Sequence, residues 1–492
     1  MKTFTLRLIN ERYGLVIILI FILSRIIFSF KGGSFLATPL FFAKQYLDPL
    51  LLENDLLRSL FYLHSQPPLF NCFLGVILKI SPLPEISYEL LFKTAGMLIP
   101  LLFYGILTSF GIHSLIAFIA TVIFMLNPTL ILYENLLYYT YIEALFILLA
   151  IFFLLRWGIE KRLIYLCLFW SSLLCLGMIR SLFHLVFFLI TSATLSLYLW
   201  YANKGQRLAR NFLLTSLIVL IPMFALCIKN VCLYGFFGSS SWDGMSLWIK
   251  ANGYAPEKLE KFYQSGIISQ QALRAGHETF QPVHHYFGES ELERILCHHP
   301  ADCNEWRSSG KPNYNHVGYV LLSKQLWKDA VSLILHNPTL FAFYTAGSYS
   351  LTLWHSSDSV HALFMNNMWV VERLETFYRF LYFGFLGVES KRSTHYMWWV
   401  RTIIISMIFL LFYTSTLINV SRNNNSLSPT VIIVCLFCLL IHIYTLCTSS
   451  LIEFGENNRF RFPVDAAFWI LIAGNIVSLK TASKFKTGRR ID

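Results

Sequence analysis

The chain has 492 residues, of which 56% are hydrophobic and 13% are charged. Soluble domains carry about 25% charged residues, so this composition excludes a soluble globule, a disordered chain and a collagen-like repeat. The 39 Lys and Arg residues outnumber the 27 Asp and Glu residues, and the net charge is +12. Because the basic residues stand in short tracts beside apolar segments, they indicate membrane topology rather than nucleic-acid binding. We therefore expect a multi-pass membrane protein with no nucleic-acid partner.

Apolar runs recur along the chain at lengths close to the roughly 20 residues that one membrane crossing needs. They lie at about 13–30, 88–108, 114–133, 139–155, 163–177, 182–202, 212–229, 399–418, 429–446 and 466–479. The first run follows Lys2, Arg7 and Arg12 without a small-residue cleavage site after it, so we interpret it as an uncleaved first span. The pattern predicts an all-α polytopic fold with about ten membrane-spanning helices.

Basic tracts set the expected direction of these spans. The tracts at 156–162, 204–210 and 480–490, together with Arg422, belong in the cytoplasm by the positive-inside rule. The apolar stretch 69–80 is only about 12 residues long, and counting it as a span would move the first two tracts outside. We interpret this stretch as a helix that lies in the outer membrane interface.

This topology divides the chain into three parts. Residues 1–235 form a transmembrane module whose first outer loop covers 31–87. Residues 236–397 form an outer region of mixed, mostly helical structure, and residues 398–492 hold the C-terminal transmembrane helices with an outer loop at 447–465. We expect both termini in the cytoplasm.

Acidic residues are scarce, and three of them share one short segment of the first outer loop. Asp48, Glu53 and Asp55 are followed by His64 and Gln66. On a continuous helix Asp48 and Asp55, seven residues apart, would share one face and direct two carboxylates to one point. Asp48 precedes a proline and is also a good helix N-cap. Glu53 can equally be a solvated surface acid, and His64 and Gln66 can simply end a helix before the double proline.

A second polar group belongs to the same side of the membrane. It comprises Glu134 and Tyr138 in one turn, Arg180 in another, Lys229 at the end of the seventh apolar run, and Glu456, Arg459 and Arg461 before the last. Positive charge at an outer membrane end runs against the topological bias, and arginine binds lipid phosphate well. The alternative is that Glu–Arg pairs only join helices. An enzyme that uses a lipid-phosphate sugar needs an acid–base carboxylate and cations near the departing phosphate, and both are present here.

Three polar segments of the outer region have more than one interpretation. Cys297 and Cys303 flank two histidines, but their spacing matches no zinc pattern, and we favour a local disulfide over a metal site or two free thiols. We predict no metal cofactor, although a divalent cation remains an alternative. The segments 235–244 and 311–316, which are rich in aromatic and polar residues, either line a sugar site or form ordinary turns.

Three segments resemble a known family. The segment 64–69, His-Ser-Gln-Pro-Pro-Leu, is similar to the His-Pro-Pro-Leu element of the C-type (GT-C) glycosyltransferase superfamily. The spacing of Glu53 and Asp55 resembles the modified acidic motif of that superfamily, and the segment 456–463 is similar to its Glu…Arg-x-Arg-x-Pro pattern. The resemblance covers residues 1–235 in architecture. The usual Asp-Glu pair after the first span is missing, which leaves open whether Asp48 or Asp55 is the base.

The resemblance implies an inverting transferase that moves a sugar from a polyprenyl-phosphate donor to a hydroxyl of an acceptor glycan, lipid or protein. Asp48 or Asp55 would be the base, with Glu53 beside them, and the phosphate would leave toward Arg180, Arg459 or Arg461. The expected place is a bacterial inner membrane, in contact with its lipids and with a periplasmic active face. A flippase of lipid-linked sugars and a non-catalytic envelope-assembly protein are the alternatives. A transporter is expected to carry charged residues within its membrane spans. The spans of this chain are nearly free of charge, and Glu143 is the main exception.

Overall fold

The computed structural model describes residues 12–202, 206–353, 367–381, 395–421, 428–453 and 455–486. These residues form helices and no β-strand, and two isolated bridges pair Leu36 with Leu136 and Trp306 with Pro312. Lys2, Arg7, Arg422 and the basic tail after residue 486, all expected in the cytoplasm, lie outside the described residues. The predicted all-α polytopic class is confirmed.

Each of the ten apolar runs coincides with helical structure, but not every helix has the length of a span. In the described part of the chain, seven helical segments are long and apolar enough to cross a membrane. They are α2 (Arg12–Phe30), α7 (Pro84–Ser109), α10 (Tyr139–Glu160), the pair α13 (Gln206–Thr215) and α14 (Leu217–Tyr234), α24 (His395–Ser421), α25 (Pro429–Ile452), and α26 (Asn457–Arg461) with η3 (Phe462–Val464) and α27 (Asp465–Lys486).

The remaining three runs form shorter or bent helices. The helices α11 (Leu163–Ile179) and α12 (Leu185–Tyr201) have 17 residues each. The helices α8 (Ser114–Met125) and α9 (Pro128–Glu134) meet at an angle of 58° and would make an eighth span if counted together. The bend has a local cause, because Asn127 accepts a hydrogen bond from the backbone N–H of Thr129 and so begins a new helix at Pro128. The total of about ten spans stays a prediction.

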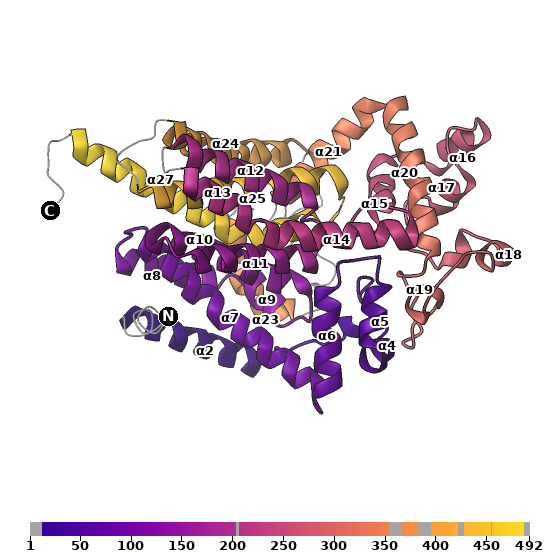
Figure 1. Ribbon diagram of the computed structural model, residues 1–492, viewed down its shortest axis with the longest axis horizontal. Coiled ribbons are helices and arrows are strands. Elements are labelled where there is room, and N and C mark those ends of the chain that lie inside the picture. Colours follow the sequence, from indigo (N-terminus) through magenta and orange to yellow (C-terminus); the bar gives the residue numbers. More distant parts are fainter. Residues whose placement is uncertain are drawn as a thin grey trace.

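The long helices lie side by side, and the helices α4–α6 and α15–α20 gather at one end of them (Figure 1). The helix α10 packs against α11, α7 and α25, and α25 packs against α27 and α24. Figure 1 shows that α2 begins and α27 ends at the left of the bundle, while α4–α6 and α15–α20 lie at the right. The two ends of the bundle are therefore different.

The first outer loop contains α3 (Pro39–Phe42), α4 (Pro49–Asn54), α5 (Leu56–Phe61) and α6 (Leu69–Ile80). The predicted helix at 69–80 is confirmed, and in Figure 1 it runs across the direction of the long helices. The expectation of one continuous helix carrying Asp48 and Asp55 is wrong. Asp55 has φ −137° and ψ 56°, so it separates α4 from α5 and the two carboxylates do not share a helix face.

Residues 242–333 have a hydrophobic core of their own, around Met245, Trp248 and Leu326. The helices of this region are α15 (Asp243–Ala251), α16 (Pro256–Gln264), α17 (Gln270–Ala275), η1 (Val283–His285), α18 (Glu289–Leu292), α19 (Pro300–Cys303), α20 (Gly318–His336) and α21 (Pro338–Thr352), and α23 (Met368–Leu381) follows. At Gly244 a side-chain Cβ would come within 1.9 Å of the Ser323 carbonyl oxygen, so glycine is required where α15 packs on α20.

A buried ion cluster joins the N-terminal helices. The Glu134 carboxylate is fully buried and lies 2.6 Å from Arg25 Nη2 and 3.1 Å from Lys93 Nζ, and it accepts a hydrogen bond from the Tyr141 hydroxyl at 3.3 Å. Gly96 leaves room for this carboxylate, because a Cβ there would lie 2.5 Å from Glu134 Oε2. One interpretation of the glutamate–arginine pairs was that they only join helices. The contacts of Glu134 agree with that interpretation.

We predict that Glu134→Ala destabilises the fold, because it leaves the buried charge of Arg25 and the partly exposed charge of Lys93 without their anion. Loss of one partner of a buried ion pair costs about 3–5 kcal/mol. The measurement is the apparent melting temperature of the detergent-purified protein, with the exposed acid of Glu53→Ala as the control. Equal melting of both variants and the wild type would contradict a structural role for the cluster.

Candidate functional site

A cavity of about 730 Å³ lies between the first outer loop, α15 and the neighbouring ends of α10, α11 and α25. Its lining comes from five separate parts of the chain: residues 42–45 with Gln66, the turn at 138–139, the turn at 180–184, the segment 240–249 and the segment 448–460. Phe280 and Lys311 complete the wall. Because the first outer loop, the bundle and the outer region all contribute, the cavity forms only in the folded chain.

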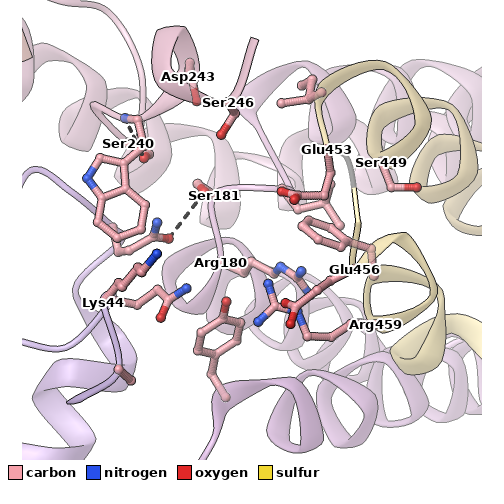
Figure 2. A pocket seen from close by; sticks show the side chains of 18 of the residues that line it. Lys44, Arg180, Ser181, Ser240, Asp243, Ser246, Ser449, Glu453, Glu456 and Arg459 are labelled. Atoms are coloured by element: carbon pink, nitrogen blue, oxygen red, sulfur yellow. Dashed lines mark hydrogen bonds and ion pairs between the residues drawn. The ribbon is translucent and has the colours of Figure 1, made fainter. Parts of the chain in front are cut away.

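Two arginines form one side of the cavity (Figure 2). Arg180 follows the last residue of α11 in an extended conformation, with φ −139° and ψ 131°, and its Nη1 donates a hydrogen bond to Glu143 Oε2 at 2.8 Å. Arg459 lies on α26, where its Nη1 donates to the Tyr138 hydroxyl at 2.6 Å and its Nε lies 3.2 Å from Glu456. Both guanidinium groups contact the Phe460 ring, at 4.0 and 5.4 Å from its centre.

The two arginines are held in place by hydrogen bonds, but not all of their hydrogen-bond donors have a partner among the described residues. Arg180 is 3% exposed and Arg459 is 8% exposed, so water does little to screen either charge. Arg180 Nη2 is buried and has no hydrogen-bond partner among the described residues. Such a donor is costly to leave unpaired, and an oxyanion in the cavity would satisfy it. The arrangement fits a ligand with a negatively charged oxygen.

A carboxylate lies on the other side of the cavity. Asp243 is the first residue of α15, and Ser246 and Ile249 follow it on the same face of the helix and also line the cavity. Figure 2 shows Asp243 and Ser246 at one side, with Arg180, Glu456 and Arg459 at the other. Burial raises the pKa of the Asp243 carboxyl above its ordinary value, and His184 opposes part of this effect. A carboxylate in this setting is a stronger proton acceptor than one in water.

Aromatic and polar groups line the wall near Lys44. The Lys44 ammonium lies 4.4 Å from the centre of the Phe280 ring, and burial lowers its pKa. The Trp242 ring lines the same cavity, and the Ser181 hydroxyl donates a hydrogen bond to Gln66 Oε1 at 3.3 Å. Aromatic faces beside hydrogen-bonding side chains are typical of pockets that orient a polar ligand such as a sugar.

Five residues predicted from the sequence as substrate-binding line this cavity: Gln66, Tyr138, Arg180, Glu456 and Arg459. For the segments 235–244 and 311–316 the sequence left open a sugar site or ordinary turns, and Trp242, Asp243 and Lys311 are part of the cavity wall. Sequence reasoning assigned no catalytic role to Asp243 and no site role to Glu453 or His184. One sequence feature could have identified Asp243: it is an acidic residue within a segment rich in aromatic residues and serine that follows a membrane span.

The three acids predicted as catalytic do not line the cavity. Asp48 caps α4 and accepts hydrogen bonds from the backbone N–H and the hydroxyl of Ser308, at 2.7 and 2.5 Å, so it joins the first outer loop to the outer region. Asp55 lies 2.9 Å from His299 Nε2. Glu53 is exposed on α4. The N-cap interpretation of Asp48 is confirmed.

His64 positions the segment that carries Asp243. Its Nδ1 lies 2.9 Å from the Ser241 hydroxyl, its carbonyl accepts from the Ser241 N–H, and the Ser240 hydroxyl donates to the carbonyl of Ser65. Burial, with a smaller contribution from the charge of Lys229, lowers the pKa of His64 to about 3, so the imidazole is neutral at physiological pH. His64 therefore does not line the cavity itself but fixes the start of α15.

The remaining predicted residues also hold elements together. Lys229 donates a hydrogen bond from Nζ to the carbonyl of Leu63 at 2.6 Å. Arg461 donates to Asp465 and to the carbonyl of Thr352, both at 2.9 Å. Glu134 belongs to the ion cluster described above. None of these three side chains lines the cavity.

The outer region contains the disulfide expected between Cys297 and Cys303. It closes a short loop in which the backbone N–H groups of His298 and His299 donate to Asp302, and Tyr234 donates to the same carboxylate at 3.0 Å. Within the described residues, no three His, Cys, Asp or Glu side chains are grouped so that they could hold a metal ion. The disulfide interpretation of these cysteines is confirmed.

Comparison of the chain with family models, curated proteins and solved structures gives no match. The resemblance to the C-type glycosyltransferases therefore stays a prediction, and function has to be inferred from the cavity.

We predict that Asp243→Asn changes stability in a pH-dependent way. Because burial raises the pKa of Asp243 above 3.8, the folded chain holds this proton to a higher pH than the unfolded chain. Below the pKa of the unfolded chain the carboxyl is protonated in both states and does not change the stability. Above the raised pKa of the folded chain the ionised carboxylate lowers the stability by its full amount. Asn cannot ionise, so the variant should match the wild type at about pH 3 and melt higher at about pH 8.

The measurement is a pair of thermal melts at each pH, with the exposed acid of Glu257→Gln on α16 as the control. A difference between Asp243→Asn and the wild type that is the same at both pH values would contradict a raised pKa.

Proposed function

We propose that the chain is a membrane glycosyltransferase that moves a sugar from a polyprenyl-phosphate donor to an acceptor hydroxyl. The observation that carries the proposal is the cavity itself, in which two buried arginines lie opposite the half-buried carboxylate of Asp243. Transfer from a lipid phosphate needs these two kinds of group at the end of a membrane bundle, where the phosphate of a membrane lipid lies.

In this proposal the arginines receive the leaving phosphate. Negative charge develops on the phosphate oxygens as the sugar departs, and fixed cations in a site of low dielectric stabilise that charge most. Arg180 supplies the unpaired Nη2, and Arg459 is oriented by Tyr138 and Glu456. Arg180 follows a 17-residue apolar helix, so the phosphate would sit at the membrane surface while its polyprenyl chain runs along apolar helices.

Asp243 takes the role of base. It accepts the proton of the acceptor hydroxyl while that oxygen attacks the anomeric carbon, and the bond from the anomeric carbon to the phosphate oxygen breaks with its electron pair leaving on the phosphate. A single displacement of this kind inverts the anomeric centre. The sequence favoured Asp48 or Asp55, but both lie outside the cavity and hold other groups, so Asp243 replaces them in the proposal.

The proposed side of the membrane is the outer one. The Cys297–Cys303 disulfide is a feature of oxidising compartments, and it lies in the region that contributes α15 to the cavity. In Figure 1 the described helices begin and end at the other end of the bundle. These observations support a periplasmic cavity and cytoplasmic ends in a bacterial inner membrane.

We predict that Asp243→Asn and Arg459→Ala each lose transfer activity. Removal of a general base costs about 10²–10⁴ in rate, and removal of one charge-stabilising donor costs about 10²–10³. The measurement is consumption of a radiolabelled polyprenyl-phosphate sugar by detergent-purified protein, with thermal melting to check the fold. Asp55→Asn is the matched control, because it changes an acid outside the cavity and should keep activity within about threefold of the wild type.

The assay also separates the rival functions. A flippase or an assembly protein binds the lipid but does not consume it, so absence of donor consumption by the wild type would contradict the transferase. Full activity of Asp243→Asn together with loss in Asp55→Asn would return the base to the first outer loop.

A further inference from the structure

A second cavity, of about 520 Å³, lies beside α15 in the outer region. Its polar and aromatic lining is provided by Lys250, Asn252, Tyr254, His277 and Tyr344. Ile249 lines both this cavity and the first one, so the two cavities are neighbours. No role in phosphate binding or proton transfer in the proposed reaction falls to these side chains.

Asn252 lines this cavity and has a hydrogen-bond acceptor without a partner among the described residues. Its Nδ2 donates to the carbonyl of Gly276 at 2.5 Å, and because a carbonyl only accepts, the amide nitrogen must face Gly276. The side-chain oxygen is then directed elsewhere, and it is buried without a hydrogen-bond partner among the described residues. The whole residue is 3% exposed, and a buried acceptor without a donor is unfavourable. A ligand hydroxyl would satisfy it.

Tyr344 supplies an aromatic ring that is fixed before any ligand arrives. Its hydroxyl donates to the carbonyl of Gly253 at 3.3 Å, and the ring packs so closely that a Cβ on Gly253 would lie 1.9 Å from a ring carbon. The Lys250 ammonium donates to the carbonyl of Tyr344 at 2.8 Å and to the hydroxyl of Ser348, which joins α15 to α21. A rigid ring loses little conformational entropy when a ligand stacks on it.

We propose that this second cavity binds a saccharide portion of the acceptor, so that the acceptor is a glycan rather than a protein or a simple lipid. A fixed tyrosine ring beside a free amide oxygen matches the apolar face and the hydroxyl groups of a sugar. The Lys250 ammonium is engaged by α21, which favours a neutral saccharide over a phosphate. This inference rests on the proposed transferase function, because it assigns the second substrate of that reaction.

The geometry of α15 connects the two sites. Asp243, Ser246 and Ile249 line the first cavity, while Ile249 and Lys250 line the second. Seven residues of helix separate Asp243 from Lys250, which corresponds to roughly 10 Å along the axis at 1.5 Å per residue. An acceptor that reaches both places therefore needs more than one sugar unit, with its reacting hydroxyl at Asp243 and its earlier units on Tyr344.

The test is ligand-observed saturation-transfer NMR with the full chain in detergent. The probes are neutral oligosaccharides of two to four units of glucose, mannose, galactose or N-acetylglucosamine. We expect at least one probe to bind the wild type, and Tyr344→Ala and Asn252→Leu each to weaken that binding about tenfold or more, as loss of a well-placed contact does. The control is Tyr263→Ala, which removes an exposed tyrosine of α16 that lines neither cavity.

Two results would overturn the inference: no probe binds the wild type, or the probes bind Tyr344→Ala and Asn252→Leu as tightly as the wild type. If Tyr344→Ala fails to fold, Tyr344→Phe keeps the ring and should keep binding, and Asn252→Leu then decides. Consumption of the polyprenyl-phosphate sugar is measured separately. Saccharide binding without donor consumption contradicts the transferase alone, and donor consumption without saccharide binding contradicts the acceptor site alone.

Discussion

The pairing of Arg180 with Glu143 is the interaction on which the cavity depends. A lone charge inside an apolar bundle is far more costly than a paired one, so the arginine is retained only because α10 offers a carboxylate at 2.8 Å. The pair also fixes the end of α11 against α10. One guanidinium nitrogen of Arg180 is left without a hydrogen-bond partner among the described residues, and Arg180 and Arg459 both line the cavity.

The need to pair a charge with a partner also determines where the other acidic residues lie. Glu134 neutralises two cations among the N-terminal helices, and Asp48 and Asp55 connect the first outer loop to Ser308 and His299. These carboxylates are engaged in holding segments together. The acids that line the cavity are Asp243, Glu453 and Glu456, which come from parts of the chain far from the first outer loop.

Sequence reasoning found residues that line the cavity where a charge was out of place, and it failed where a helix had to be continuous. Apolar sequence is interrupted by Arg180, Glu456 and Arg459. A charged residue at the end of a membrane span is unusual enough to indicate a role from the sequence alone. The pairing of Asp48 with Asp55 assumed an unbroken helix, and the non-helical backbone at Asp55 removes it. His64 was assigned to the substrate, whereas its contacts with Ser241 show that it positions α15.

The amino-acid sequence alone determined the class of the molecule, because hydrophobic runs of nearly membrane length and scarce charge leave an all-helical membrane protein as the outcome. It also predicted the helix at 69–80 and favoured the disulfide over its alternatives, since both depend on neighbouring residues. Only the tertiary structure decided which acid faces the arginines. That choice depends on hydrogen bonds between residues as distant as Ser65 and Ser240, and no local pattern contains them.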